Sequence, residues 1–112
     1  GVLPDQEPEA DGGGVFAPFF GEPALTMTLL AKLAARTGPE VLFVVAERLP
    51  RGRGWRVHFV AAEPGIGDAD KTRAAAALNR SVERCIRICP EQYLWSYRRF
   101  RERPDGSRRP YQ

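Results

Sequence analysis

The sequence predicts an α/β fold, because continuous apolar runs typical of strands alternate with segments whose apolar residues recur at helical spacing. The chain has 112 residues, of which 43% are hydrophobic and 28% are charged, so it can bury one modest core. We therefore expect residues 1–112 to form a single unit. Glycine and proline cluster near both ends, which predicts irregular segments around a folded middle.

The N-terminal segment is expected to be the end of a strand followed by a loop. A short apolar start that stops at Asp5 predicts the tip of a buried strand at 1–5, and a chain that begins inside a fold. Residues 6–22 combine acids, three consecutive glycines and an apolar patch. This segment is too irregular for a helix and too apolar for a solvated linker, so we interpret it as an active-site-type loop.

A helix and a strand are predicted next. Pro23 suits the first turn of a helix, and leucines at helical spacing predict that this helix covers 23–37, before a Gly-Pro break. Residues 40–48 contain a continuous β-branched and aromatic run. Such a run is typical of a strand that is buried on both faces.

The second half of the chain is predicted to contain a strand, a helix and a tail. Residues 55–62 follow a polar Arg-Gly-Arg-Gly turn and are expected to form the next strand. Either Asp68 or Asp70 can cap the helix that follows, and an apolar stripe predicts that this helix covers 68–89. Residues 90–112 interleave aromatic residues with arginines and predict a basic aromatic tail.

The charge distribution and the two cysteines limit the cellular compartments and the kinds of site that the sequence is compatible with. The net charge is only +3, but acids crowd the start of the chain and arginines crowd its end. No apolar run approaches the ~20 residues needed to cross a bilayer, and no signal-peptide pattern is present. Cys85 and Cys89 are four residues apart in the expected helix, which suits neither a disulfide nor a metal site. We expect both to be small core residues in a reducing, cytoplasmic setting, and we expect no metal or cofactor.

Two separated blocks resemble motifs of one known family. Residues 90–100 read PEQYLWSYRRF and are trailed by Arg103-Pro104, which closely resembles the C-terminal signature of the lipid A biosynthesis lauroyl/myristoyl acyltransferases. The central motif of that family resembles LPDQ at 3–6, followed by GVFAPFFG at 14–21 and then Pro23-Ala24. The resemblance covers nearly the whole chain but matches only the C-terminal portion of a family member.

The resemblance implies a fold context and an activity. The chain would be the C-terminal part of a glycerolipid-acyltransferase-like three-layer α/β/α domain. Members of the family are enzymes at the cytoplasmic face of the bacterial inner membrane, and they move a fatty acyl chain from acyl carrier protein to a phosphorylated lipid A precursor. Their H-x-x-x-x-[DE] dyad, in which His is the general base, lies upstream of the blocks matched here. Because this chain lacks that dyad, we expect it to be inactive alone.

One stretch of the chain satisfies the dyad pattern literally. The chain's single histidine, His58, is followed five residues later by Glu63. Residues five apart on a strand point to opposite faces and lie roughly 17 Å apart, using ~3.3 Å per residue. The pair also follows the Pro-Asp-Gln block, whereas the family's dyad precedes it. We therefore expect His58 to be a decoy.

Asp5 is the residue expected to be functional. It would lie in a loop just past the C-terminal end of a strand, where α/β sheets bind ligands. The alternative is an aspartate that stabilises a turn after Pro4 through nearby backbone N–H groups. Turn statistics favour the alternative, whereas the family resemblance favours the functional role. Gln6 is a weaker substrate-binding candidate beside it.

Two further groups are expected to contact substrate. Phe19, Phe20 and Gly21 can line an acyl-chain or acceptor pocket, or the two rings can simply cover the edge of a sheet. Arg98 and Arg99 offer planar forks for the phosphates of the acceptor. The aromatic residues around these arginines suit an anionic membrane surface, and the alternative is a solvated basic face with the rings in the core.

A rival hypothesis comes from another class of protein. The C-terminal Arg and aromatic segment can belong to a small basic module that binds nucleic acid or anionic membrane. Nucleic acid is the less favoured partner, because the sequence contains no nucleic-acid-binding motif and its acids gather at the other end.

Overall fold

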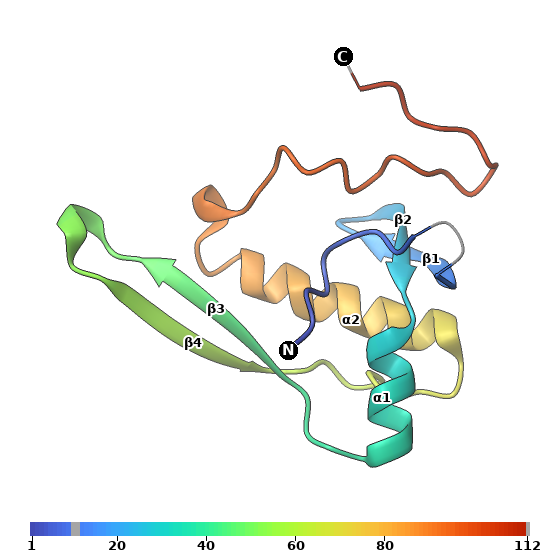
Figure 1. The fold of residues 1–112 in the computed structure, drawn as a ribbon, viewed down its shortest axis with the longest axis horizontal. Coiled ribbons are helices and arrows are strands. Elements are labelled where there is room, and N and C mark those ends of the chain that lie inside the picture. Colours follow the sequence, from blue (N-terminus) through green and yellow to red (C-terminus); the bar gives the residue numbers. More distant parts are fainter. Residues whose placement is uncertain (10–11, 112) are drawn as a thin grey trace.

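Two antiparallel hairpins and two helices make up the fold, which a computed structural model describes for residues 1–9 and 12–111 (Figure 1). In chain order the strands and helices are β1 (Gly14–Phe19), β2 (Glu22–Met27), α1 (Leu29–Thr37), β3 (Leu42–Arg48), β4 (Trp55–Ala61) and α2 (Lys71–Ile86). The predicted α/β class is confirmed. Among the described residues the strands pair as β1 with β2 and β3 with β4, both antiparallel.

The predicted loop at 6–22 is wrong over its second half, because β1, its turn and the start of β2 occupy residues 14–22. Residues 10 and 11 of that range lie outside the described residues. A two-residue turn joins Phe19 to Glu22, and both of its residues, Phe20 and Gly21, have positive φ angles of 47° and 81°. That backbone is the tightest hairpin turn and fits the twist of the strands, although Phe is an unusual residue for it.

Helix α1 begins later than predicted. Pro23 lies in β2 opposite Pro18, and not in the first turn of a helix. The residues after it alternate, since Ala24 and Thr26 are fully buried while their neighbours are partly exposed. The helix therefore begins at Leu29 and ends, as predicted, at the Gly-Pro break, where Gly38 has a left-handed φ of 60° and donates its N–H to the Ala34 carbonyl.

The N-terminal strand tip predicted at 1–5 is not a strand in the structure. Pro4 and Asp5 lie in a turn, and no neighbouring strand pairs with these residues within the described part of the chain. Since Pro4 has no N–H to donate, the local sequence favours a turn unless another strand supplies partners.

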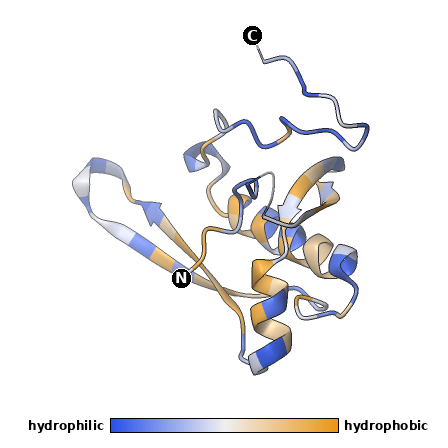
Figure 2. Ribbon diagram, turned by 45° about the vertical axis from the view of Figure 1, so that its right-hand side comes forward, coloured by the Kyte–Doolittle hydropathy of each residue, from blue (hydrophilic) through white to orange (hydrophobic). Residues whose placement is uncertain are grey.

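Strands β3 and β4 lie within their predicted ranges, but the burial on both faces predicted for the strand at 40–48, which is β3, is wrong. Phe43 packs against α2 and is 7% exposed, whereas its neighbour Val44 is 59% exposed. On the paired strand Val57 and Phe59 are 51% and 70% exposed on the same side as Val44. The hairpin projects from the body of the molecule, and apolar colour runs along both of its strands near the body (Figures 1 and 2).

Helix α2 organises the core. The Asp70 carboxylate accepts hydrogen bonds from the N–H groups of Thr72 and Arg73, at 2.9 and 3.1 Å, so Asp70 is the N-terminal cap. The helix ends at Ile86, before the predicted residue 89, and Cys89 is non-helical, as expected for a residue that precedes proline. The buried cluster around α2 consists of Phe19, Ala24, Phe43, Leu78, Val82, Cys85 and Ile86.

The cysteines behave as the sequence predicts. Cys85 and Cys89 are 8% and 6% exposed, and neither forms a disulfide. Burial raises the pKa of the Cys85 thiol, which keeps it protonated at neutral pH. Both are packing residues of the core.

The C-terminal tail follows a short 3₁₀ turn at Pro90–Gln92 and runs across the molecule without a further helix or named strand, as far as Tyr111. It corresponds to the predicted tail at 90–112, whose final residue lies outside the described residues. None of the helices in the described ranges is long and apolar enough to cross a membrane.

Candidate functional site

An apolar cleft of about 930 Å³ lies between β3, the C-terminal half of α2 and the N-terminal turn. Val82, Cys85 and Ile86 of α2 form an apolar wall. Asp5 and Tyr93 line the same cleft and add polar groups to it. An apolar cleft with a few polar groups is the usual form of a ligand site.

Tyr93 and Asp5 approach one another at this cleft. The tyrosine ring is half-buried, and its hydroxyl oxygen is fully buried without a hydrogen bond of good geometry. Burial raises the pKa of Tyr93 to about 12, assisted by the negative charge of Asp5 and by a polar contact between the two side chains. The hydroxyl therefore stays protonated at neutral pH and is available as a donor.

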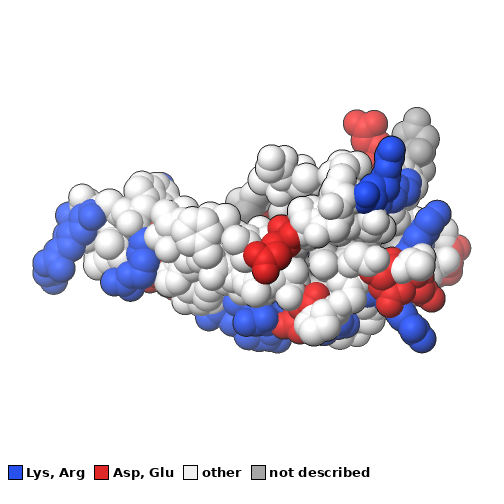
Figure 3. Space-filling view, turned by 90° about the horizontal axis from the view of Figure 1, so that it is seen from below, with Lys and Arg blue, Asp and Glu red and all other residues white. Residues whose placement is uncertain are grey.

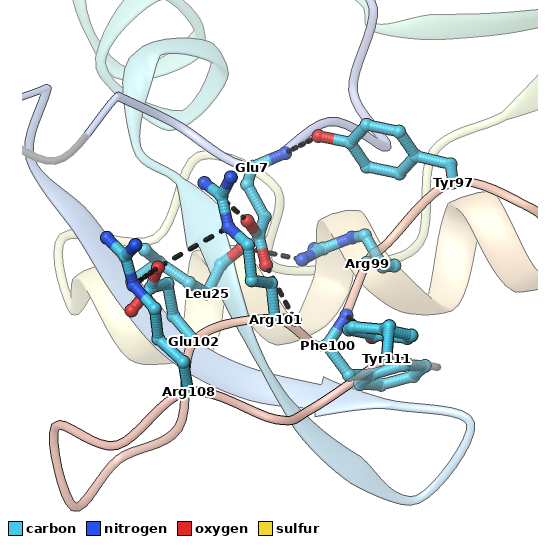
Figure 4. Close-up of polar contacts among 9 residues, drawn as sticks. All are labelled: Glu7, Leu25, Tyr97, Arg99, Phe100, Arg101, Glu102, Arg108 and Tyr111. Carbon is cyan, nitrogen blue, oxygen red and sulfur yellow. Dashed lines mark hydrogen bonds and ion pairs between the residues drawn. The ribbon is translucent and has the colours of Figure 1, made fainter.

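Arg99 is buried beneath the β1–β2 hairpin, with 3% of its surface exposed. Its guanidinium donates to the Leu25 carbonyl at 2.6 Å, to Thr26 Oγ1 at 3.2 Å and to Asn79 Oδ1 at 3.4 Å, and Figure 4 shows the first of these bonds. Burial lowers the pKa of Arg99, and the nearby Glu7 carboxylate opposes this effect. Arg99 thus joins the tail to β2 and α2.

Glu7 joins the N-terminal segment to the tail (Figure 4). Its side chain is only 5% exposed, and its carboxylate accepts the Arg101 N–H at 3.1 Å and pairs with the Arg101 guanidinium at 3.3 Å. The Glu7 N–H donates to the Tyr97 hydroxyl at 2.9 Å. The residue directly after the block at 3–6 is therefore bonded to the block at 90–100 and to the residue that follows it, although the two segments are far apart in the sequence.

The structure does not bring Arg98 and Arg99 together as one phosphate fork. Arg98 is exposed, and its guanidinium lies 5.6 Å from the centre of the Tyr111 ring, whereas Arg99 is buried and engaged as described. This placement argues against contact between Arg99 and a phosphate, and leaves Arg98 as the accessible member of the pair.

The predicted pocket residues of the β1–β2 hairpin do not line the apolar cleft. Phe19 is 2% exposed and belongs to the core cluster, in agreement with the covering role that the sequence left open. Phe20 is 37% exposed at the turn, where its N–H donates to Glu83 at 2.7 Å and Arg87 lies 5.3 Å from its ring. Gly21 completes the turn, and Gln6 is exposed beside Asp5.

His58 and Glu63 have different partners. His58 lies 2.8 Å from the Glu47 carboxylate, across the hairpin. Glu63 pairs with Arg84 at 2.9 Å, and its N–H donates to Ser81. The two side chains therefore do not form the hydrogen bond that a dyad needs.

The remaining arginines of the tail are interleaved with acids. Glu102 pairs with both Arg101 and Arg108, at 3.4 and 3.0 Å, and Glu22 lies 3.9 Å from Arg109. Basic and acidic side chains also alternate over the body on the face shown in Figure 3, while the end of the β3–β4 hairpin is basic. This mixture of signs disfavours a continuous groove for nucleic acid.

Sequence reasoning missed two residues that organise the site. Asn79 is 1% exposed and donates to the Pro18 carbonyl at 3.1 Å and to Thr26 at 2.9 Å. The sequence did contain one indication of this role, because an amide side chain within the apolar stripe of α2 is buried and needs hydrogen-bond partners. Tyr93 was grouped only with the aromatic residues of the tail. No group of three or more metal-ligating side chains occurs among the residues described.

Comparison with known proteins agrees with the resemblance seen in the sequence. A family model for bacterial lipid A biosynthesis acyltransferase matches residues 1–102. The lipid A biosynthesis lauroyltransferase of Escherichia coli (strain K12) is 40% identical over 105 residues, which cover 88% of this chain and 34% of that protein. The palmitoleoyltransferase of the same strain and an acyltransferase of Shigella flexneri are each 38% identical over 104 residues, covering 92% of this chain and 33% of those proteins.

The chain therefore spans about a third of the length of the curated relatives that it matches. The match of the family model extends over more than nine-tenths of the chain and includes both sequence blocks. On this evidence, the chain belongs to the bacterial lipid A biosynthesis acyltransferase family.

Proposed function

We propose that the chain is the C-terminal part of a lipid A acyltransferase, and that the complete protein moves a fatty acyl chain from acyl carrier protein to a phosphorylated lipid A precursor. Family membership supports the reaction class. The observation that carries the proposal for this chain is the position of Asp5, which lines an apolar cleft and lies beside the block at 90–100.

Different residues of the chain bind different parts of the substrate. The apolar wall on α2 suits an alkyl chain, because burial of each methylene contributes about 0.8 kcal/mol. Asp5 is the hydrogen-bond acceptor of the cleft that orients a polar group of the substrate. The general base of the reaction belongs to the dyad expected upstream, so residues 1–112 alone would bind without turning over.

The same proposal places the protein at the cytoplasmic face of the bacterial inner membrane. Leu94 and Trp95 are 64% and 58% exposed, and Phe20 lies 6.0 Å from the Trp95 ring. The exposed Arg87 lies 5.3 Å from the centre of the Phe20 ring, and the exposed Arg98 follows Trp95 closely in the sequence. Aromatic rings with neighbouring arginines suit the headgroup level of an anionic leaflet.

An acyl-transfer assay with the complete protein that carries residues 1–112 tests the proposal. Labelled acyl groups are supplied on acyl carrier protein or on coenzyme A, and the acceptor is either a phosphorylated lipid A precursor or a glycerol phosphate. We expect transfer only from acyl carrier protein to the lipid A precursor, and none by residues 1–112 alone. Transfer to glycerol phosphate alone would contradict the proposed acceptor.

Replacing Arg98 with glutamine is expected to raise the KM for the lipid A precursor about tenfold, which is ~1.4 kcal/mol of lost binding. The reason is that Arg98 offers an exposed fork for a phosphate. Steady-state kinetics with varied acceptor measures this KM. Arg53→Gln, at the exposed tip of the β3–β4 hairpin, is the matched control. An unchanged KM in Arg98→Gln would remove this residue from the acceptor site.

A further inference from the structure

Two buried polar atoms lack a hydrogen-bond partner within the described part of the chain, and they are the hydroxyl oxygen of Tyr93 and the Nε of Arg99. Both side chains lie close enough to Asp5 for its charge to act on them. A buried donor without a partner costs about 1–3 kcal/mol, so such atoms are rare and often mark functional sites. Both atoms belong to side chains near Asp5, the residue that we propose orients the substrate in the cleft.

We propose that Tyr93 is a positioning residue, whose hydroxyl donates to the Asp5 carboxylate and holds it in the orientation that the cleft requires. The inference rests on the proposed function of Asp5. Both residues line the same cleft, and the Tyr93 hydroxyl is buried there without a hydrogen-bond partner among the described residues, while a polar contact links the two side chains.

The tyrosine is the fixed partner of this pair. Its N–H donates to the Pro90 carbonyl at 3.3 Å, and its own carbonyl accepts from the Trp95 N–H at 2.9 Å. The Trp95 ring stands edge-on to the Tyr93 ring, with 4.9 Å between the ring centres. Asp5, in contrast, lies half-buried in a turn, and no hydrogen bond of its carboxylate is found among the described residues.

Most of the other groups near Asp5 already have partners. The terminal nitrogens of the Arg99 guanidinium donate to β2 and to Asn79, while its Nε has no partner in the described ranges, and the Tyr97 hydroxyl accepts from the N–H of Glu7. The Glu7 carboxylate is paired with Arg101. Within the part of the chain that the structure describes, Tyr93 is therefore the neutral donor near Asp5 that lacks a partner, and it remains protonated throughout the neutral range because its pKa is about 12.

An NMR measurement on the 112-residue chain tests the inference. The change is Tyr93→Phe, and the Asp5 side-chain carbon is observed at pH 7. Loss of the proposed hydrogen bond is expected to move this resonance. Tyr111→Phe, whose hydroxyl serves the Phe100 N–H, is the matched control and should leave the resonance in place. An unmoved Asp5 resonance in a folded Tyr93→Phe chain overturns the proposal.

The reciprocal substitution gives a second, independent measurement. Asp5→Asn removes the charge that assists burial in raising the pKa of Tyr93, so this pKa is expected to fall below about 12 while burial keeps it above the ordinary tyrosine value. The Tyr93 ring carbon beside the oxygen reports its ionisation as the pH is raised from about 9 to about 13. Asp105→Asn, in the exposed turn near the C-terminus, is the control. If Tyr93 titrates identically in Asp5→Asn and in the unmodified chain, the two side chains are not coupled and the proposal is wrong.

The failure of this inference is distinguishable from the failure of the proposed function. Both NMR measurements use residues 1–112 and require no enzyme activity, whereas the acyl-transfer assay requires the complete protein. In that assay Tyr93→Phe is expected to lower kcat with KM for both substrates retained, and to cause no further loss when Asp5 is already replaced by alanine. Additive losses in the double variant would indicate a role of Tyr93 that is independent of Asp5 and contradict the positioning role.

Discussion

Replacing Arg99 with leucine is expected to lower the free energy of unfolding of the chain by about 3 kcal/mol. The substitution leaves the Leu25 carbonyl, the Thr26 hydroxyl and the Asn79 amide oxygen without the donor that now serves them. Thr26 and Asn79 are almost fully buried, so water cannot replace the guanidinium without opening the packing. With a urea m-value of about 1.5 kcal/mol/M, the midpoint should fall by roughly 2 M.

The neighbouring arginine supplies a matched control for this experiment. Arg98→Leu removes the same side chain one residue earlier from an exposed position, and should change the free energy of unfolding by no more than about 0.5 kcal/mol. Arg99→Lys keeps the charge but loses the planar fork, so it should remain clearly destabilising. Equal effects of the two leucine substitutions would show that Arg99 does not hold the tail to the hairpin and α2.

The predictable part of the fold is the part whose pattern is local and continuous. Strand β3 begins with an uninterrupted apolar run, β4 is rich in aromatic and β-branched residues after a polar turn, and α2 has both a stripe and a capping aspartate at Asp70, so each could be placed from sequence. The β1–β2 hairpin could not, because Pro18 and Pro23 face one another across it and suggest a loop or a helix start. Its turn places Phe20 at a position where glycine or asparagine is usual.

Of the candidate site, only the two sequence blocks at 3–6 and 90–100 could be identified from the sequence. Asp5 was singled out from the LPDQ motif, and its functional role stays a prediction. Arg99 could not be separated from Arg98 by sequence, since adjacent arginines both read as a solvated basic surface. Only the tertiary arrangement, which places the tail over β2 and Asn79, makes one of them a buried structural residue. The proximity of Tyr93 to Asp5 depends on the same long-range packing.

Replacing Asp5 with alanine is expected to lower kcat/KM of the complete protein at least about 100-fold, which is ~2.7 kcal/mol of lost transition-state stabilisation. The reason is that Asp5 supplies a carboxylate to the apolar cleft, where a charged acceptor is worth more than in water. Its carboxylate makes no hydrogen bond of good geometry among the described residues, so the free energy of unfolding should change by less than about 1 kcal/mol. Acyl-transfer kinetics and urea unfolding of the same variant measure the two quantities.

Controls separate a role in the reaction from a role in the turn. Asp105→Ala removes another aspartate from another turn, far from the cleft, and should leave kcat/KM unchanged. If Asp5 only stabilised the turn after Pro4, Asp5→Ala would lower the urea midpoint and leave turnover near normal, which would contradict its functional role. If it orients substrate, Asp5→Asn should also be impaired, because the amide keeps the shape of the side chain but loses the charge. A fall in kcat with unchanged KM for both substrates would place the action of Asp5 in the transition state, since uniform loss of binding would raise KM instead.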